Sequence, residues 1–240
     1  MYSEIRKKRF DQVWDAIVAA GLGNDLYPEE AKLRYSLPIE NGKGQYIFKL
    51  CRNSAANNLT TFALTENDVF IPSAIGVMIA ITGSDGVQHL YPYAPKKPQG
   101  ADSVYAAGFE SDTIEALYNG HLTWKSGTNI ILNQYPMEKF KKVPRQQGAF
   151  VLDSNDQAVS ECIQPEWSID KCLELLMARY TVAGNMDHFV HVNFDAATKT
   201  FPVTSGYTAE LVLFLDGFLV KGGAQTINGK RAFGDAPARF

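Results

Sequence analysis

The side chains of this chain that could bind a metal are few, and their spacing argues against a shared site. His188 and His191 form an H-x-x-H pair. The residues around them alternate as in a strand, and residues three apart on a strand point to opposite faces of the sheet. One metal ion cannot contact both imidazoles without a break in that strand. His89 and His121 lie in or beside predicted strands without an obvious partner, so we expect ordinary hydrogen-bonded histidines and no metal site.

The candidate nucleophiles also lack the sequence context that catalysis requires. No G-x-S-x-G elbow places a serine on a strand-to-helix turn. Cys51, Cys162 and Cys172 are an odd number at spacings that match no zinc or redox motif. Cys172 falls on the apolar face of a predicted helix, where it is a small core residue. We therefore expect neither an enzyme nor a bound cofactor.

Two concentrations of positive charge could bind a polyanion or an acidic neighbour. The first is a run of four near the N-terminus: Arg6, Lys7, Lys8 and Arg9. These residues either contact packaged nucleic acid or form the solvated first half of a helix. The second cluster ends at Arg145, and we interpret it as a solvated loop or as a contact with an acidic subunit. The net charge of -3 excludes bulk attraction to nucleic acid or acidic membranes, so any such binding is local.

Aromatic side chains are dense through the centre of the chain. Tyrosine tolerates a half-exposed position because its ring packs while its hydroxyl group forms hydrogen bonds. Aromatic and arginine side chains are also enriched at protein interfaces, so we expect the tyrosines beside prolines to contact other subunits. Together with helical and terminal residues, the predicted assembly contacts are Phe10, Trp14, Tyr91, Tyr93, Tyr135, Arg145, Arg231 and Phe240.

One clear helix and a series of strands position these side chains. From Ser3 to Ala20 apolar residues recur at intervals of three and four, which predicts an amphipathic helix that Gly21 terminates. Residues 33–39 and 45–50 are extended candidates separated by Asn-Gly-Lys-Gly, which predicts a hairpin. Further strands are predicted at 60–64, 69–82, 87–93, 121–125, 128–134, 188–194 and 209–220.

Two more helices and a bend complete the predicted elements. Residues 111–118 open with a capping-box pattern and form a short helix. Residues 169–180 place their apolar side chains on one helical face, which predicts another helix. Pro72 and Gly76 mark a bend or bulge in the strand at 69–82.

The short apolar segments alternate with glycine, asparagine, aspartate and proline, which predicts a mainly β fold. Such segments bury themselves by stacking in two sheets, so we expect a jelly-roll-like β-sandwich with an N-terminal amphipathic helix and one or two short helices. The predicted organisation is a helical arm at 1–22, a sandwich domain at 23–224 with 144–157 as the candidate point of division, and a C-terminal arm at 225–240.

The chain contains no predicted targeting or membrane segment. Its N-terminus is too polar for a signal peptide. The longest apolar run, residues 69–81, is shorter than the roughly 20 residues that span a bilayer as a helix. We therefore expect a reducing cytoplasm and no membrane partner.

Three stretches of the chain resemble structural proteins of tailed or icosahedral bacteriophage virions in their pattern. They are residues 62–80, 118–144 and 210–224. The resemblance implies a jelly-roll-like or related sandwich, many identical copies in a shell or connector, termini that reach neighbours, and no catalytic residues. It also implies that the partners are copies of this chain and other virion proteins, and that the virion is assembled in the host cytoplasm. The absence of a long spine-like helix leaves a major shell, minor shell or connector role open.

Two other functions remain as alternatives to a self-assembling virion protein. A carbohydrate- or receptor-binding β-sandwich would present aromatic side chains such as Trp124 and Tyr135 for stacking on a ligand. Such a module would be a stable monomer with affinity for glycans. A hydrolase on a β scaffold is the third alternative, although no acid pair or catalytic triad stands out.

Overall fold

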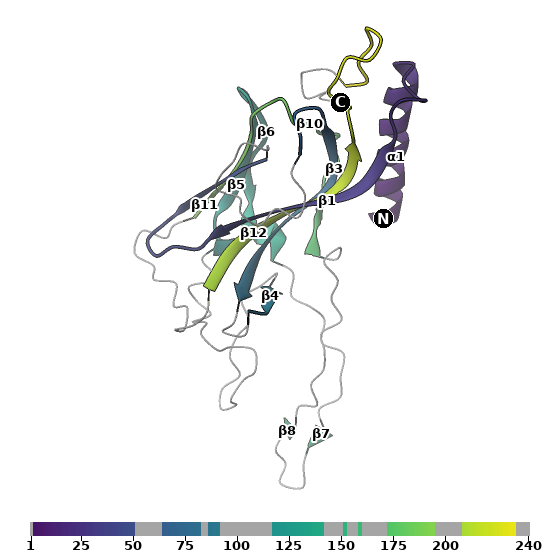
Figure 1. Cartoon of the computed structure of the whole chain (residues 1–240). Coiled ribbons are helices and arrows are strands. Elements are labelled where there is room, and N and C mark those ends of the chain that lie inside the picture. The colour runs from purple at the N-terminus through teal and green to yellow at the C-terminus, as the bar shows by residue number, and fades with distance from the viewer. Residues whose placement is uncertain are drawn as a thin grey trace.

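The computed structural model describes residues 2–50, 64–82, 86–91, 117–141, 151–152, 158–159, 172–194 and 208–233. In these residues the fold is mainly β, with one α-helix and curled antiparallel sheets (Figure 1). The mainly β class and the N-terminal helix confirm the prediction from the sequence.

Helix α1 spans Tyr2–Ala19 and ends as its sequence predicts. Gly21 has a φ of 70°, a conformation that glycine adopts without steric cost. The Gly21 N–H donates to Val18 O at 2.8 Å, and the Leu22 N–H donates to Ile17 O at 3.0 Å. This pair of bonds satisfies carbonyls that the helix leaves open, in the pattern of a Schellman motif. Leu22 and Ile17 are both buried in one cluster, which adds the apolar contact typical of that motif.

The larger sheet, which we name sheet A, contains six strands and pairs only antiparallel neighbours. Its main order is β1-β12-β3-β10, and two short strands, β4 and β9, also pair with β3. The bounds are β1 Pro28–Pro38, β3 Val69–Thr82, β4 Gln88–Tyr91, β9 Glu174–Leu175, β10 Val182–Ala183 and β12 Thr208–Val220. Strands β3 and β12 are buried over almost their whole length, as continuous apolar runs predict.

A bulge in β3 changes which side chains face the interior of the protein. Gly217 pairs with Pro72 and Asp216 pairs with Ala74, so Ser73 is the extra residue. Before the bulge Phe70 joins the largest core cluster, and after it Ile75 does so. The predicted bend or bulge is therefore confirmed beside Pro72, whereas Gly76 keeps the regular register opposite Phe214.

The second sheet, named sheet B, has the order β2-β11-β5-β6. Its strands are β2 Gln45–Lys49, β5 His121–Ser126, β6 Asn129–Pro136 and β11 His188–Asn193. A 3-10 helix, η1, follows at Met137–Phe140, and β7 (Val151–Leu152) pairs with β8 (Ala158–Val159). Gly127, with a φ of 54°, connects the antiparallel strands β5 and β6, which confirm the strands predicted at 121–125 and 128–134.

The predicted hairpin of residues 33–39 and 45–50 is wrong. Its two segments are strands, but β1 pairs with β12 in sheet A and β2 pairs with β11 in sheet B. The glycine-containing connection allows the chain to pass between sheets as readily as it allows a tight turn. Whether this connection forms a tight turn or joins the two sheets depends on pairing with the distant strands β12 and β11. A local sequence pattern contains no information about such pairing.

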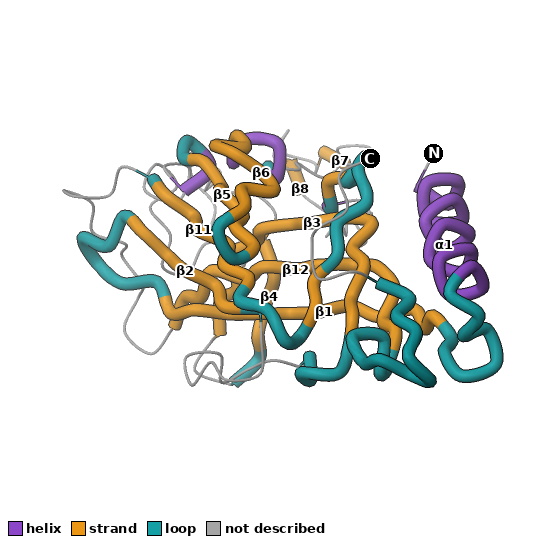
Figure 2. Tube along the Cα trace, turned by 90° about the horizontal axis from the view of Figure 1, so that it is seen from above, coloured by secondary structure: helices purple, strands orange, loops and turns teal. Residues whose placement is uncertain are grey.

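Inward-facing side chains of both sheets share one apolar cluster. It includes Leu33 of β1, Ile75 of β3 and Leu213 of β12 from sheet A, and Phe48 of β2 and Trp124 of β5 from sheet B. A second cluster lies where α1 packs on sheet A (Figures 1 and 2). A third cluster covers β3 and β12 with the segment that begins at residue 172.

The predicted helix at 169–180 is wrong over its described part, residues 172–180. This segment contains β9 and otherwise irregular backbone. Cys172 and Leu173 join the third cluster, which contains residues of β3, whereas Leu176 joins the largest cluster, which contains residues of both sheets. Apolar residues spaced for one helical face can equally contact two different faces when the backbone is extended.

Several predicted features lie wholly or mostly outside the described residues. Of the short helix at 111–118, only Leu117 and Tyr118 are described, and both are helical and buried. Of the strand at 60–64, only residue 64 is described. The candidate division at 144–157 is described only at 151–152.

Candidate assembly surfaces

The buried stripe of α1 includes an arginine from the predicted polyanion run. Arg9 is buried, and one of its terminal nitrogens donates to Leu176 O at 2.8 Å and to Ala178 O at 2.9 Å. Burial, followed by the nearby Arg179, lowers the pKa of Arg9 below its ordinary value, and Tyr180 raises it. Arg9 therefore links α1 to residues 176–178 by hydrogen bonds. Its guanidinium group is not exposed to a polyanion.

Arg6 also pairs with residues of its own chain. Its guanidinium lies 3.1 Å from Glu30 and 3.4 Å from the buried carboxylate of Asp216. The same group lies over the ring of Phe218 at 6.0 Å. Of the four cations, Lys7 and Lys8 are the exposed pair, and contact with nucleic acid remains a prediction for them.

Beside the buried stripe, α1 presents a half-exposed apolar stripe. Phe10 and Trp14 both contact Tyr27, with ring centroids at 6.3 and 5.7 Å. Phe10 also packs on Phe218 of β12 at 5.5 Å. Val18 remains 51% exposed and Tyr27 63% exposed. We name Phe10, Trp14, Val18 and Tyr27 the α1 surface; the structure thus brings together two predicted assembly contacts, Phe10 and Trp14.

The described part of the predicted C-terminal arm folds back beside α1. Ile227 and Lys230 exchange two backbone hydrogen bonds of 2.9 Å, and Phe233 is buried in the cluster that holds Val13 and Ile17. Figure 1 shows this segment next to the helix. Arg231, a predicted contact, donates from Nε to Thr226 Oγ1 at 2.8 Å. Residues 225–233 are therefore not an extended arm, because Phe233 completes the apolar packing of α1.

The remaining predicted contacts are distributed over other parts of the chain. Tyr135 is half-buried against Phe140 of η1, with centroids at 5.7 Å. Burial, followed by Glu174, raises the pKa of its hydroxyl above the ordinary value. Tyr91 is the last residue of β4. Three others lie outside the described residues: Tyr93, Arg145 and Phe240.

Sheet B has an outer face that the sequence analysis did not single out. Lys49, Phe189, Lys125 and Ile130 form one row across its four strands. The neighbouring row contains Ile47. Ile47 and Ile130 are exposed, and Phe189 is half-buried. We name Ile47, Lys49, Lys125, Ile130 and Phe189 the sheet B surface. The sequence signal that could have identified this surface is the presence of apolar residues at both the inward and the outward positions of short strands.

The inner and outer faces of β11 separate the two histidines of the H-x-x-H pair. His188 is buried and His191 points outward. The Ala183 N–H donates to His188 Nε2 at 3.2 Å, so the neutral ring carries its proton on Nδ1. Burial lowers the pKa of His188 to about 4, although the charge of Asp187 opposes this shift. The described residues contain no group of three potential metal ligands.

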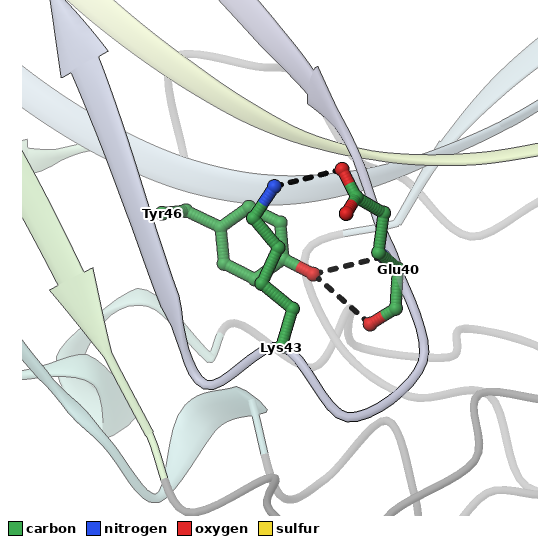
Figure 3. Close-up of polar contacts among 3 residues, drawn as sticks. All are labelled: Glu40, Lys43 and Tyr46. Carbon is green, nitrogen blue, oxygen red and sulfur yellow. Dashed lines mark hydrogen bonds and ion pairs between the residues drawn. The ribbon is translucent and has the colours of Figure 1, made fainter.

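Tyr46 closes the turn between β1 and β2 with a compact polar cluster (Figure 3). Its hydroxyl accepts from the Glu40 N–H at 2.9 Å and donates to Glu40 O at 3.3 Å. Lys43 pairs with the Glu40 carboxylate at 2.7 Å and lies 5.1 Å from the centroid of the Tyr46 ring. The ring also stacks on Phe194 at 5.6 Å. Because these groups satisfy one another, the cluster stabilises the turn and offers little to a ligand.

Trp124, which the carbohydrate alternative requires at the surface, is fully buried in the core. It lies 5.9 Å from Tyr180, between centroids. A sugar could not stack on this ring unless the core opened. This placement removes the main side chain on which that alternative depended.

Comparison of the chain with protein-family models, with curated proteins and with solved structures found no match. The described helical residues include no segment long and apolar enough to cross a bilayer.

Proposed function

We propose that the protein is a self-assembling structural protein of a bacteriophage virion, a subunit of its shell or connector. Its two sheets would stack as a β-sandwich that supplies a rigid body, and α1 would contact neighbouring copies. The virion assignment is supported by the sequence pattern described above. The self-assembly is supported by one structural observation, the exposed apolar side chains of the α1 surface.

The α1 surface is well suited to a contact between subunits. Its aromatic rings are held in place by one another and by Phe218, so little side-chain freedom remains to be lost on binding. Val18 and Tyr27 each retain about half or more of their surface in water. Burying what remains of each contributes about 1 kcal/mol, since complete burial of a large apolar side chain contributes about 1.5–3 kcal/mol.

The apolar core also supports a structural role. The inward-facing side chains of sheets A and B are close-packed in one cluster. Copies of the chain and other virion proteins are the partners, and Lys7 and Lys8 are the candidate contact to packaged nucleic acid.

The test is the mass of the purified protein in solution, measured by sedimentation across protein concentration and salt. We expect association that weakens in the Val18→Lys variant, because this change adds a charge to the apolar side chains of the α1 surface. A cation near the C-terminal end of a helix favours folding, so the subunit itself should remain intact. Val87→Lys is the matched control, since Val87 is 48% exposed and lies outside α1. A protein that stays monomeric at every concentration would refute the proposal.

A further inference from the structure

We infer that residues 184–187, which lead the chain from β10 of sheet A to β11 of sheet B, form an acid-sensitive hinge that His188 holds closed. At neutral pH the ring of His188 accepts a hydrogen bond from the start of this segment. Protonation of the ring removes that bond, and the hinge opens while the two sheets remain folded. This inference does not depend on the proposed assembly.

The hinge is also held by hydrogen bonds that do not respond to acid. The Gly184 N–H donates to Asp68 O at 2.9 Å, and Asp187 O accepts from the Gly127 N–H at 2.8 Å. A Cβ at Gly184 would overlap Thr65 O, so the glycine allows the hinge to lie close to the turn before β3. These bonds join backbone atoms, which do not titrate between pH 7 and pH 4. A sensitivity to acid must therefore come from a side chain.

His188 supplies a bond that depends on its protonation state. The Ala183 N–H donates to His188 Nε2 at 3.2 Å. A neutral imidazole has one nitrogen that accepts, whereas the protonated ring donates from both nitrogens. The protonated ring would therefore place an N–H donor against the Ala183 N–H. The proton and the bond exclude one another.

The surroundings of the ring give a proton no other stabilisation in the closed state. His188 is fully buried, and Ser126 of β5, directly opposite it, is buried as well. In the part of the chain that the structure describes, neither His188 Nδ1 nor Ser126 Oγ has a hydrogen-bond partner. A buried charge without such partners is costly, and burial accordingly lowers the pKa of His188 to about 4. Protonation therefore favours a state in which water reaches the ring.

The charged groups near His188 do not compensate for this burial. Asp187 precedes it, and its charge favours protonation, but Lys49 of β2 lies 3.6 Å from that carboxylate and offsets part of the attraction. Lys125 of β5 is exposed. The carboxylate of Asp68, in the turn before β3, accepts from two backbone N–H groups. Strand β10 contributes no ionisable side chain. The open state therefore binds the proton more tightly than the closed state.

Opening of the hinge also affects the packing of α1. Ala183 is buried in the second apolar cluster, which contains Val13 and Ile17 of the helix, and Met186 packs against the same cluster. Movement of residues 183–187 removes these contacts. The hinge thus connects the protonation of one buried ring to the support of the N-terminal helix.

The test is hydrogen–deuterium exchange of the whole chain at pH 7 and pH 4.5, followed by mass spectrometry and corrected for the intrinsic effect of pH. The opening constant of peptides that cover residues 181–188 should rise about 50-fold, because the ring binds its proton at about pH 6.5 when open and at about pH 4 when closed. Peptides from β12 report global unfolding and should keep a smaller opening constant at both pH values.

The variant His188→Gln identifies the responsible side chain. Its amide oxygen can accept from the Ala183 N–H but does not titrate, so most of the rise should disappear. His191→Gln, on the outer face of β11, is the matched control and should retain the rise. An equal rise in the unmodified chain and in His188→Gln would overturn the hinge. Equal opening constants for residues 181–188 and for β12 would also overturn it, because the segment would then open only with the whole fold.

A second measurement needs no variant. Nitrogen-15 resonances of the His188 ring report which nitrogen carries the proton and at what pH a second proton is added. We expect the proton on Nδ1 at pH 7, and loss of protection of the Ala183 amide at the pH where the ring titrates. A doubly protonated ring with the Ala183 amide still protected would overturn the inference.

Discussion

The burial of His188 predicts a specific loss of stability in acid. The ring lies in the core and is neutral because burial lowers its pKa from 6.5 to about 4. In the unfolded chain the same ring binds a proton at about pH 6.5. Between these values the unfolded state holds more protons than the folded state, so stability falls as the pH falls through this window. Below about pH 4 both states are protonated and this contribution stays constant.

The size of the effect follows from the two pKa values. At about 1.4 kcal/mol for each pKa unit, the difference between 6.5 and about 4 corresponds to about 3 kcal/mol of unfolding free energy. This is a large part of the stability of a typical domain. The assay is urea unfolding followed by tryptophan fluorescence at a series of pH values from 7 to 4, on dilute protein.

The comparison of variants isolates this residue from the carboxylates that titrate in the same range. His188→Gln removes the titration while its amide oxygen can still accept from the Ala183 N–H. We expect the stability of this variant to fall by about 3 kcal/mol less than that of the unmodified chain between pH 7 and pH 4. His191→Gln, on the outer face of the same strand, is the matched control and should alter the curve far less. Parallel curves for the unmodified chain and His188→Gln would refute the reasoning.

Two further predictions concern packing. Arg9→Lys keeps the charge but loses the planar, fixed terminal nitrogen that donates to two carbonyl groups, so the unfolding free energy should fall by about 1.5–3 kcal/mol in urea titration. Gly217→Ala should lower the thermal midpoint and cost about 1–3 kcal/mol, because a Cβ there would overlap Ile71 O and Pro72 across the bulge.

Each of these changes has a control within the chain. Lys8→Arg alters the neighbouring but exposed cation and should change stability by less than about 0.5 kcal/mol. Gly23→Ala places its Cβ at an ordinary 3.5 Å from Val18, so it should be tolerated. Equal losses in Arg9→Lys and Lys8→Arg, or in the two glycine variants, would contradict the packing described here.

Local patterns were sufficient where one residue type or one period decides the conformation. Helix α1 follows from apolar spacing and from Gly21, and the bulge in β3 was expected at Pro72. The segment at 172–180 shows the opposite case. The apolar residues of this segment fit a helical face. In the folded protein, however, a carbonyl group of the segment accepts a hydrogen bond from Arg9, which is more than 160 residues away in the chain.

The candidate surfaces were only partly predictable. Phe10 and Trp14 were expected at a contact because they are aromatic and share a helix. Ile47, Phe189 and Ile130 were not, since they come from three separate strands and become neighbours only when β2, β11, β5 and β6 align in register. The burial of Trp124 was not predicted either. An alternating pattern of apolar and polar residues shows that a strand has two faces, but it does not show which face the rest of the protein covers.

The sequence by itself determined the mainly β class, the N-terminal helix, the two long buried strands and the opposite orientation of His188 and His191. These features depend on backbone preference and side-chain period, which act over a few residues. The tertiary structure decided which strands pair, that the chain passes from sheet A to sheet B after β1, and that Arg9 and Phe233 are buried. Those outcomes depend on contacts between distant segments, whose free energy exists only once the segments are brought together.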